Sequence, residues 1–349
     1  MNFHLVRVEH GCLCRHATIH GLCLGTGPDS AMVGFQVYHD IERLHCGMGQ
    51  IGNFILGTHG LVCSLEALHG IAILAGIDKK GKPLAWKHTI VGQSIVADTL
   101  FEGFLVKNGI DVTSVEGAAT LPYLIPNLQV ELHSPKNEVP VQWWRSVGHS
   151  HTAFVVETMI DELAHLAGKD PVAYRLSILP AASRYRGVLQ LAATQAGWGK
   201  KKIPAGHAYG VAVHESFNSY VAEIAEVSLE NGKVRVHRVV AAVDCGMVIN
   251  PDGVEQQIES AIVYGLSAAL HGGITLDKGR VMQSNFNDYV PLRYSEMPKV
   301  EVHIVASNVP PSGIGEPGTP PIAPAVANAV FKLTGKRLRR MPFDQETLV

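Results

Sequence analysis

Residues 221–243 read VAEIAEVSLENGKVRVHRVVAAV, and this stretch decides the fold class more than any other. Two largely apolar runs, 221–229 and 234–243, flank Glu230-Asn231-Gly232-Lys233. Asn-Gly between such runs is the strongest short signal for a β-hairpin, because both residues tolerate the positive φ that a type I′ turn requires. The stretch therefore predicts two antiparallel strands joined by a tight turn.

The segment before this hairpin predicts three helices. Residues 152–167 place apolar side chains at helical spacing, and Gly168 provides a C-terminal stop. Asp170-Pro171 predicts the start of a second helix, with proline at its first helical position. A third helix is predicted over residues 183–196, ending at Gly197.

Further strands and helices are predicted on both sides of these blocks. Upstream, residues 71–78 and 84–91 predict a second hairpin around Lys79-Lys80-Gly81-Lys82, and residues 121–132 continue as extended chain. Downstream, the predicted elements are helices over 253–270 and 322–333 and strands over 273–276, 280–283 and 300–306. Because strands and helices form separate blocks instead of alternating, we predict an α+β fold and not a doubly wound sheet.

Residue composition and predicted elements divide the 349 residues into three parts. Residues 1–70 are rich in Cys, His and Gly and carry no predicted element, whereas residues 71–200 and 201–349 contain the blocks described above. Hydrophobic residues make up 46% of the chain and charged residues 17%, which excludes intrinsic disorder. With 29 Lys and Arg against 31 Asp and Glu, the chain has no excess of positive charge that would favour a nucleic-acid partner.

The sequence carries no signal for a membrane or for export. No apolar run approaches the roughly 18 residues of a spanning helix. The first residues, MNFHLVR, lack the basic start and the apolar stretch of a signal peptide. We therefore expect a cytoplasmic protein. The periplasm is the alternative if a missing N-terminal part carried an export signal.

Three weaker patterns point to other chemistries. Gly47-Met48-Gly49-Gln50-Ile51-Gly52 fits the glycine spacing of a dinucleotide-binding loop, but no convincing strand precedes it, and we interpret the match as chance. The early cysteines, Cys12 and Cys14 among them, lack the Cys-x2-Cys pair usual in zinc and iron–sulfur sites. His149 and His151 could coordinate a metal from a loop, so a zinc or iron enzyme built on His149, His151 and the early cysteines is kept as an alternative.

The strongest candidate site is Gly313-Ile314-Gly315-Glu316-Pro317-Gly318. It places a carboxylate in a loop stiffened by prolines, in which glycines let the backbone approach a ligand closely. The predicted helix over 322–333 follows at once, and a helix N-terminus favours the ionised carboxylate that a general base requires. The alternative is that Glu316 only caps this helix.

A second candidate loop is Trp143-Trp144-Arg145-Ser146-Val147-Gly148, just before the predicted helix over 152–167. It presents an arginine among aromatic and small residues. Arginine suits bidentate binding of a carboxylate, phosphate or oxo group, and aromatic faces suit a planar ligand. The alternative is an arginine stacked on tryptophan at the surface.

Together these loops resemble the molybdenum-binding large subunit of the xanthine dehydrogenase/aldehyde oxidase superfamily. The resemblance runs from about residue 75 to residue 343. Besides the two loops, its markers in chain order are Val91-Gly92-Gln93-Ser94-Ile95, Thr113-Ser114-Val115-Glu116-Gly117-Ala118, Ala242-Val243-Asp244-Cys245-Gly246 and Ile249-Asn250-Pro251.

The resemblance implies a pterin-bound molybdenum, as the cytosine dinucleotide, and a small partner subunit with two 2Fe–2S clusters. It implies hydroxylation of an N-heterocycle such as isoquinoline, or of an aldehyde, with oxygen taken from water. By position, Glu316 matches the family's base, and Arg145 matches an arginine in the loop that faces the molybdenum. The implied cofactor-binding residues are Ser146, Val147, Gly148, Gly313 and Gly315, and none of them is a metal ligand.

The resemblance has two gaps. Residues 1–70 do not resemble the family, and the glycine- and phenylalanine-rich pterin-binding loop expected upstream of residue 75 is missing. We therefore expect the C-terminal half of a large subunit, with residues 71–200 and 201–349 as the two parts of its cofactor-binding region. The alternative is a truncated, cofactor-free subunit without catalytic activity.

Overall fold

The computed structural model describes residues 30–33, 55–64, 67–136, 139–345 and 348. The patterns at Gly47-Met48-Gly49-Gln50-Ile51-Gly52 and at Cys12 and Cys14 lie outside these residues, so their interpretations stay predictions. Within the described part of the chain, no helix is both long and apolar enough to cross a membrane.

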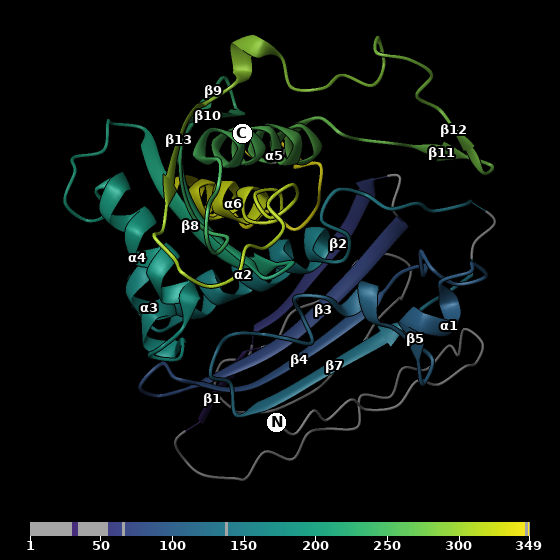
Figure 1. Cartoon of the computed structure of the whole chain (residues 1–349), viewed down its shortest axis with the longest axis horizontal. Helices are drawn as coiled ribbons and strands as arrows, with labels where there is room; N and C mark the ends of the chain where they lie inside the picture. Colours follow the sequence, from purple (N-terminus) through teal and green to yellow (C-terminus); the bar gives the residue numbers. More distant parts are fainter. Residues whose placement is uncertain (1–29, 34–54, 65–66, 137–138, 346–347, 349) are drawn as a thin grey trace.

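A first sheet is built around the upstream hairpin (Figure 1). Strands β3 (Ala67–Asp78) and β4 (Pro83–Val91) pair antiparallel, which confirms the predicted hairpin. Strand β7 (Asn127–His133) pairs parallel to β4, while β1 (Ser30–Val33) and β2 (Ile55–Ser64) both pair antiparallel to β3. The segment predicted as extended over 121–132 is therefore a strand only in its second half.

The three predicted helices follow this sheet. They are α2 (His149–Leu166), α3 (Pro171–Ile178) and α4 (Arg184–Ala196). Local capping explains two of them, because Asp170 and Ser183 accept hydrogen bonds from the first-turn amides of α3 and α4. Helix α2 begins at His149, earlier than its apolar periodicity predicts. The side chains of its first turn are polar although they are buried, so the apolar pattern does not include them.

The second sheet contains the hairpin at residues 221–243. Strands β9 (Ser219–Glu230) and β10 (Lys233–Asp244) pair antiparallel around Asn231 and Gly232, whose φ values of 52° and 78° are those of the predicted turn. β13 (Lys299–Ile304) pairs parallel to β10, and β8 (His207–Ser216) pairs antiparallel to β9. No sequence signal predicted β8.

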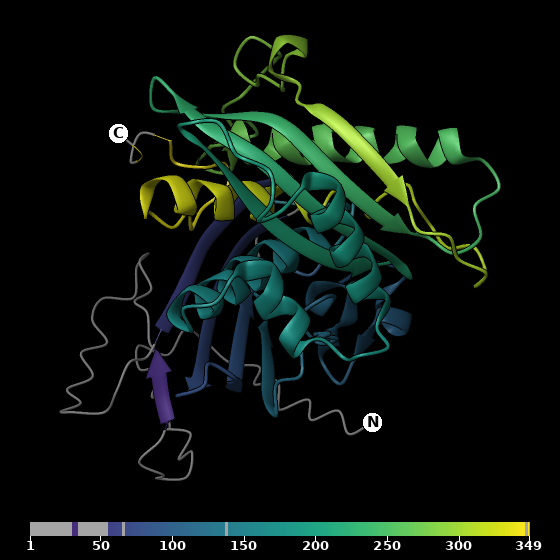
Figure 2. The same cartoon turned by 90° about the vertical axis from the view of Figure 1, so that its left-hand side faces the viewer.

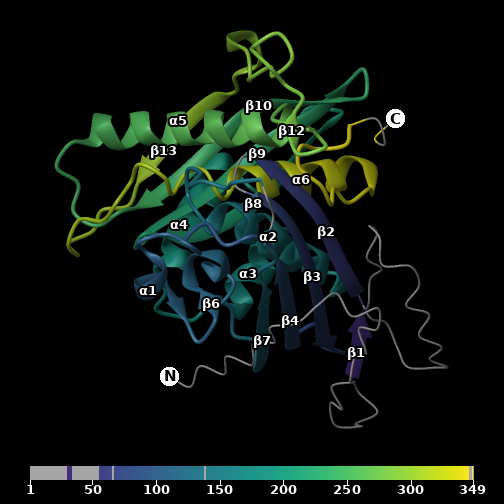
Figure 3. The same ribbon diagram turned by 90° about the vertical axis from the view of Figure 1, so that its right-hand side faces the viewer.

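Helices cover both faces of the second sheet. A Cβ at Gly210 would strike the backbone of α6 (Ile322–Thr334), whereas the neighbouring Tyr209 ring stacks on Trp198, just after α4. Successive residues of a strand point to opposite faces, so α6 and α4 lie on opposite sides of the sheet. Figure 2 shows α4 on the outer side, and Figure 3 shows α6 between the two sheets, with α5 (Pro251–Leu270) above it.

Short elements complete the chain. They are α1 (Glu102–Leu105), β5 (Val106–Lys107), β6 (Ile110–Asp111), the 3₁₀ helices Val112–Val115 and Tyr294–Glu296, and the exposed ribbon of β11 (Leu276–Asp277) and β12 (Arg280–Val281). The ribbon is shorter than the strands predicted over 273–276 and 280–283.

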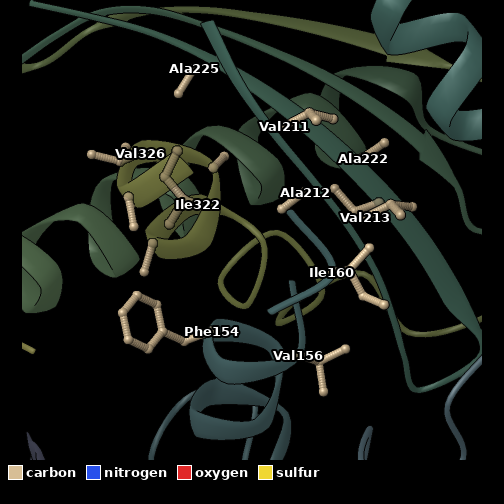
Figure 4. Close-up of a cluster of buried hydrophobic side chains, with 14 of the residues drawn as sticks. Phe154, Val156, Ile160, Val211, Ala212, Val213, Ala222, Ala225, Ile322 and Val326 are labelled. Atoms are coloured by element: carbon tan, nitrogen blue, oxygen red, sulfur yellow. The ribbon is translucent and has the colours of Figure 1, made fainter. Parts of the chain in front are cut away.

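The main core lies where α2, α6 and the second sheet meet. Phe154 and Ile160 of α2, Ala212 of β8 and Ile322 and Val326 of α6 belong to one buried hydrophobic cluster (Figure 4). Burying such side chains contributes roughly 1.5–3 kcal/mol each. Separate strand and helix blocks that pack in this way confirm the predicted α+β fold.

A buried ion pair joins the elements around this core. Glu157 and Arg175 are both 0% exposed. The Glu157 carboxylate accepts hydrogen bonds from Arg175 Nε at 2.9 Å, from the amide of Val213 at 3.0 Å and from the Tyr123 hydroxyl at 2.5 Å. Asn328 Nδ2 donates to the Glu157 carbonyl at 3.3 Å. The Glu157 carboxylate thus connects α2, α3 and β8, and the main-chain carbonyl of Glu157 is bonded to α6.

His88 of β4 predicts acid sensitivity of the fold. It is fully buried, neither ring nitrogen has a hydrogen-bond partner in the described structure, and burial lowers its pKa from 6.5 to about 3. Between these values the unfolded chain binds a proton that the folded chain does not, so stability falls as the pH is lowered through this window.

The test compares wild type with His88→Leu in urea unfolding between about pH 6.5 and pH 4. The wild-type free energy of unfolding should fall more steeply with acid, by about 1 kcal/mol per pH unit, because the variant lacks this group. Equal slopes for the two proteins would contradict the burial of a neutral His88.

Candidate functional site

The two loops singled out in the sequence meet in space. Arg145 Nε donates to the Gly315 carbonyl at 2.7 Å, and the Ser146 amide donates to Glu316 Oε1 at 2.9 Å. Two consecutive residues of one loop therefore bind two consecutive residues of the other. The first turn of α6 has no side-chain cap, so the interpretation of Glu316 as its helix cap has no support in the structure.

Arg145 is held by the outer helix as well. Its Nη1 donates to Ser260 Oγ at 3.0 Å, its Nη2 contacts Gln257 Oε1 at 3.3 Å, and its guanidinium lies 5.6 Å from the centre of the Tyr264 ring. All three partners belong to α5. The guanidinium thus binds groups of the protein itself, and it fixes the Gly315 loop against α5.

The turn at residues 146–148 has an uncommon backbone. Ser146 and Val147 have φ values of 82° and 48°, which non-glycine residues, and β-branched ones above all, rarely adopt. Ser150 Oγ donates to the Val147 carbonyl at 2.6 Å. A Cβ at Gly148 would lie 1.8 Å from the Thr113 carbonyl oxygen. Such strain persists only where the surroundings impose it, and it gathers at functional sites.

Gly148→Ala should therefore destabilise the protein. The added Cβ cannot fit beside Thr113 unless backbone moves, and overpacking of this kind costs about 1–3 kcal/mol. Gly187→Ala is the matched control, since no described atom lies within 4 Å of its Cβ in α4. The control should gain about 0.5–1 kcal/mol from helix propensity. Urea unfolding of both variants decides, and a Gly148→Ala protein as stable as wild type would show that the turn can shift freely.

A second carboxylate lies on the other side of this turn. The Gly148 amide donates to Glu116, and His149 Nε2 lies 3.8 Å from Glu116 Oε2. Burial raises the pKa of Glu116 to about 7, with the charges of Asp111 and Glu316 adding to the rise. The Ser146 and Gly148 amides thus each hold one carboxylate. The sequence contained Glu116 within a family marker, but nothing in it assigned this residue a place in the site.

The tip of the β8–β9 hairpin borders the Gly313 loop. Ser219 Oγ donates to the Gly313 carbonyl at 2.6 Å. Arg184, at the start of α4, donates to the Asn218 carbonyl at 3.1 Å and binds Asp244 through Nε at 2.8 Å and Nη2 at 2.6 Å. The hairpin tip is therefore fixed between α4 and the Gly313 loop. Sequence reasoning missed Arg184 and the tip, because their partners lie far away in the chain.

Two glycines of the Glu316 loop, Gly313 and Gly315, are not explained by protein packing. A Cβ at Gly313 would meet only Phe217 Cβ, at 3.7 Å, and a Cβ at Gly315 only Gln257 Oε1, at 3.8 Å, among the described atoms. Both are ordinary contact distances, and neither glycine has a positive φ. A ligand that approaches the backbone closely would explain glycine at both positions.

Several buried polar atoms around these loops lack a hydrogen-bond partner among the described residues. Ser146 Oγ, Thr319 Oγ1 and Glu116 Oε2 form no hydrogen bond within the described residues. Buried polar groups are almost always paired, so unpaired ones call for an explanation. A bound group with hydrogen-bonding atoms would provide one.

The histidines of the zinc or iron alternative have other partners. His149 Nδ1 lies 2.9 Å from His214 Nε2, and His151 Nε2 lies 3.1 Å from the Ser114 carbonyl. Burial lowers the pKa of His149 to about 4. Over the described ranges, no group of three or more His, Cys, Asp or Glu could hold a metal ion.

Known proteins with similar sequences identify the class of domain. Two family profiles, each described as a molybdopterin cofactor-binding domain, match residues 69–178 and 153–298. The fold and the matched profiles thus define a molybdopterin cofactor-binding domain over residues 69–298. The orphaned hydroxyls and the open glycines fit such a group.

The chain belongs to the xanthine dehydrogenase/aldehyde oxidase superfamily of molybdenum-binding proteins. It is 32% identical over 286 residues to the beta chain of isoquinoline 1-oxidoreductase from Brevundimonas diminuta, an alignment that covers 81% of this chain and 36% of that protein. It is also 32% identical over 244 residues to a nicotinate dehydrogenase from Pseudomonas putida, with coverage of 64% of this chain and 20% of that protein. The chain therefore spans about a third or less of these curated relatives.

A solved structure shows the same fold. Quinoline 2-oxidoreductase from Pseudomonas putida 86 superposes with a TM-score of 0.67 at 13% identity, covering 80% of this chain and 61% of that one. At this identity the likeness concerns the fold alone.

Proposed function

We propose that this chain forms the cofactor-binding part of a molybdenum hydroxylase large subunit, with residues 71–200 and 201–349 as its two parts. The enzyme oxidises an N-heterocycle such as isoquinoline, or an aldehyde, with oxygen from water. The cofactor is molybdenum-molybdopterin cytosine dinucleotide. When bound, this group supplies the oxidising centre that accepts the substrate's electrons. A small partner subunit with 2Fe–2S clusters carries the electrons away.

The hydrogen bonds between the Arg145 loop and the Glu316 loop are the main support for this proposal. Glu316 is the general base, and the Ser146 amide at 2.9 Å orients its carboxylate while leaving Oε2 to accept a proton. Arg145 is a positioning residue, because its guanidinium fixes the Gly315 backbone and Ser260 of α5. Ser146, Val147 and Gly148 form the strained turn beside the base. Gly313 and Gly315 leave room for the cofactor.

The names of the relatives support the substrate class. The isoquinoline and nicotinate enzymes both bear the name of an N-heterocycle. Aldehydes are the second class, because the chain is 25% identical over 241 residues to the molybdenum-binding subunit of an aldehyde oxidoreductase from Escherichia coli. Both classes present an electron-poor carbon to a base-assisted attack.

Turnover in ¹⁸O-labelled water tests the proposal. The purified complex should convert isoquinoline or benzaldehyde to a product that carries one ¹⁸O from water, with an artificial electron acceptor present. Label from dissolved oxygen instead of water would exclude this reaction class. A folded chain that carries no molybdenum and oxidises neither compound would favour the alternative of a truncated, cofactor-free subunit without catalytic activity.

A further inference from the structure

One strained turn holds two carboxylates. The Ser146 amide donates to Glu316 Oε1 at 2.9 Å, and the Gly148 amide, two residues later, donates to the Glu116 carboxylate. Val147 between them has a positive φ of 48°, which a β-branched residue rarely adopts. The two carboxylates are therefore held at one place in the fold, where the charge of each acts on the other.

Glu116 also lies beside two buried histidines, His149 and His214 (the histidine pair). Glu116 Oε2 is buried without a hydrogen-bond partner among the described residues, and His149 Nε2 lies 3.8 Å from it. On the other side of the ring, His149 Nδ1 lies 2.9 Å from His214 Nε2. Gly117 lets the main chain pass closely, since its φ is 73° and a Cβ there would lie 2.7 Å from His214 Cε1. The carboxylate and the two imidazoles thus form one connected row.

The contact between the two rings allows two arrangements of protons. Burial lowers the pKa of His149 to about 4 and that of His214 well below its usual range, so each ring is neutral and carries one N–H. In the first arrangement, His149 Nδ1 donates to His214 Nε2, and a bare His149 Nε2 faces a protonated Glu116. In the second, His214 Nε2 donates to His149 Nδ1, and His149 Nε2–H faces an ionised Glu116.

The histidine pair therefore lets Glu116 change its charge without burying a charged imidazole. From the first arrangement to the second, the Glu116 proton passes to His149 Nε2 and the proton on His149 Nδ1 passes to His214 Nε2. The proton on His214 Nδ1 is the one released, so one proton leaves and both rings stay neutral.

Other charges face this row from the elements packed against it. Burial raises the pKa of Glu116 to about 7, and the charges of Asp111, Glu316 and Glu215 add to the rise. Arg145 attracts the charge of Glu316 and so favours its ionised form. Glu116 is thus the carboxyl beside the base that changes its charge near neutral pH.

We propose that Glu116 and the histidine pair set the proton affinity of Glu316, strengthening the base when Glu116 ionises and weakening it when Glu116 holds its proton. The inference rests on the proposed function and deepens it. A second negative charge beside Glu316 makes a proton on that carboxylate more favourable, and a base that binds its proton more tightly removes it faster. Glu116 and the histidine pair act through Glu316 and are positioning residues.

The pH dependence of turnover tests the proposal. In the molybdenum-loaded complex, the kcat/KM of wild type should rise by about 2- to 10-fold as the pH is raised through 7, where Glu116 loses its proton. Glu116→Gln keeps an oxygen for the Gly148 amide but carries no charge at any pH, so its profile should stay flat over this window. Glu255→Gln is the matched control, since Glu255 is exposed on α5, and it should follow wild type.

Nitrogen-15 NMR of the His149 ring provides a readout that needs no turnover. In the folded wild-type chain, the N–H should move from Nδ1 to Nε2 as the pH rises through 7, with the ring neutral throughout. In Glu116→Gln one tautomer should persist over the same range, and Glu255→Gln should behave as wild type. The signals of His149 are identified by their loss in His149→Gln.

The two measurements separate this proposal from the proposed function. If wild type oxidises neither isoquinoline nor benzaldehyde, the proposed function fails, and the NMR titration still decides on the proton exchange between Glu116 and the histidine pair. Parallel pH profiles of wild type and Glu116→Gln, or a His149 tautomer that does not change with pH, would overturn the proposal.

Discussion

Replacing Glu316 with Gln should lower turnover per molybdenum by on the order of 10²–10⁴, the usual worth of a positioned acid–base group. The amide keeps an oxygen that can accept from the Ser146 amide, which lies 2.9 Å from Oε1 in wild type, so the link between the two loops survives. Only the capacity to take a proton is removed. Folding stability and cofactor content should therefore stay near wild type.

Glu316→Ala separates the two roles of this side chain. It removes the acceptor as well as the base, so it should lower turnover equally and also loosen the turn at Ser146. Turnover normalised to bound molybdenum is measured beside the urea midpoint for both variants. Activity of Glu316→Gln within a few-fold of wild type would end the assignment of Glu316 as the base.

Replacing Glu157 with Ala should cost about 3–5 kcal/mol of folding stability, the largest structural effect expected in this chain. The carboxylate is fully buried and accepts from Arg175, Tyr123 and the Val213 amide. Without it, the guanidinium of Arg175 stays buried with Asp161 as its nearest described carboxylate, 3.9 Å away. An uncompensated charge in the interior is what makes the loss large.

The double variant Glu157→Leu with Arg175→Met tests this reason. Removing both charges leaves apolar side chains of similar length, so much of the lost stability should return. Urea unfolding of the single and double variants gives the comparison. If the double variant is as unstable as Glu157→Ala, the loss comes from the lost hydrogen bonds of Tyr123 and Val213 rather than from the stranded charge.

Local chemistry made much of the fold predictable. Asn231-Gly232 identified its hairpin, and Asp170 and Ser183 identified helix starts, because in each case the signal and its structural consequence lie within a few residues. Strand β8 was missed for the converse reason. Its turn is Phe217-Asn218, which carries no hairpin signal, and the tip is fixed by long-range bonds from Arg184 to Asn218 and from Ser219 to Gly313.

The site was predictable in part. Glu316 and Arg145 stand in glycine-containing loops whose composition and order point to a ligand, and the structure brings those loops together. The sequence did not assign Glu116, Phe217 and Arg184 to the site. Their place there depends on partners more than 30 positions away, such as Gly148 and Asp244. Long-range pairing of this kind leaves no periodic or compositional trace in a single sequence.

Metal analysis of the purified, folded chain tests most directly whether it holds a molybdenum cofactor between the turn at Ser146 and the glycines of the Glu316 loop. Wild type should carry close to one molybdenum per chain. Gly313→Leu combined with Gly315→Leu should abolish binding by filling the open space beside the loop, with little loss of stability. A folded wild-type chain, isolated from cells that make the cofactor and free of molybdenum, would contradict the account.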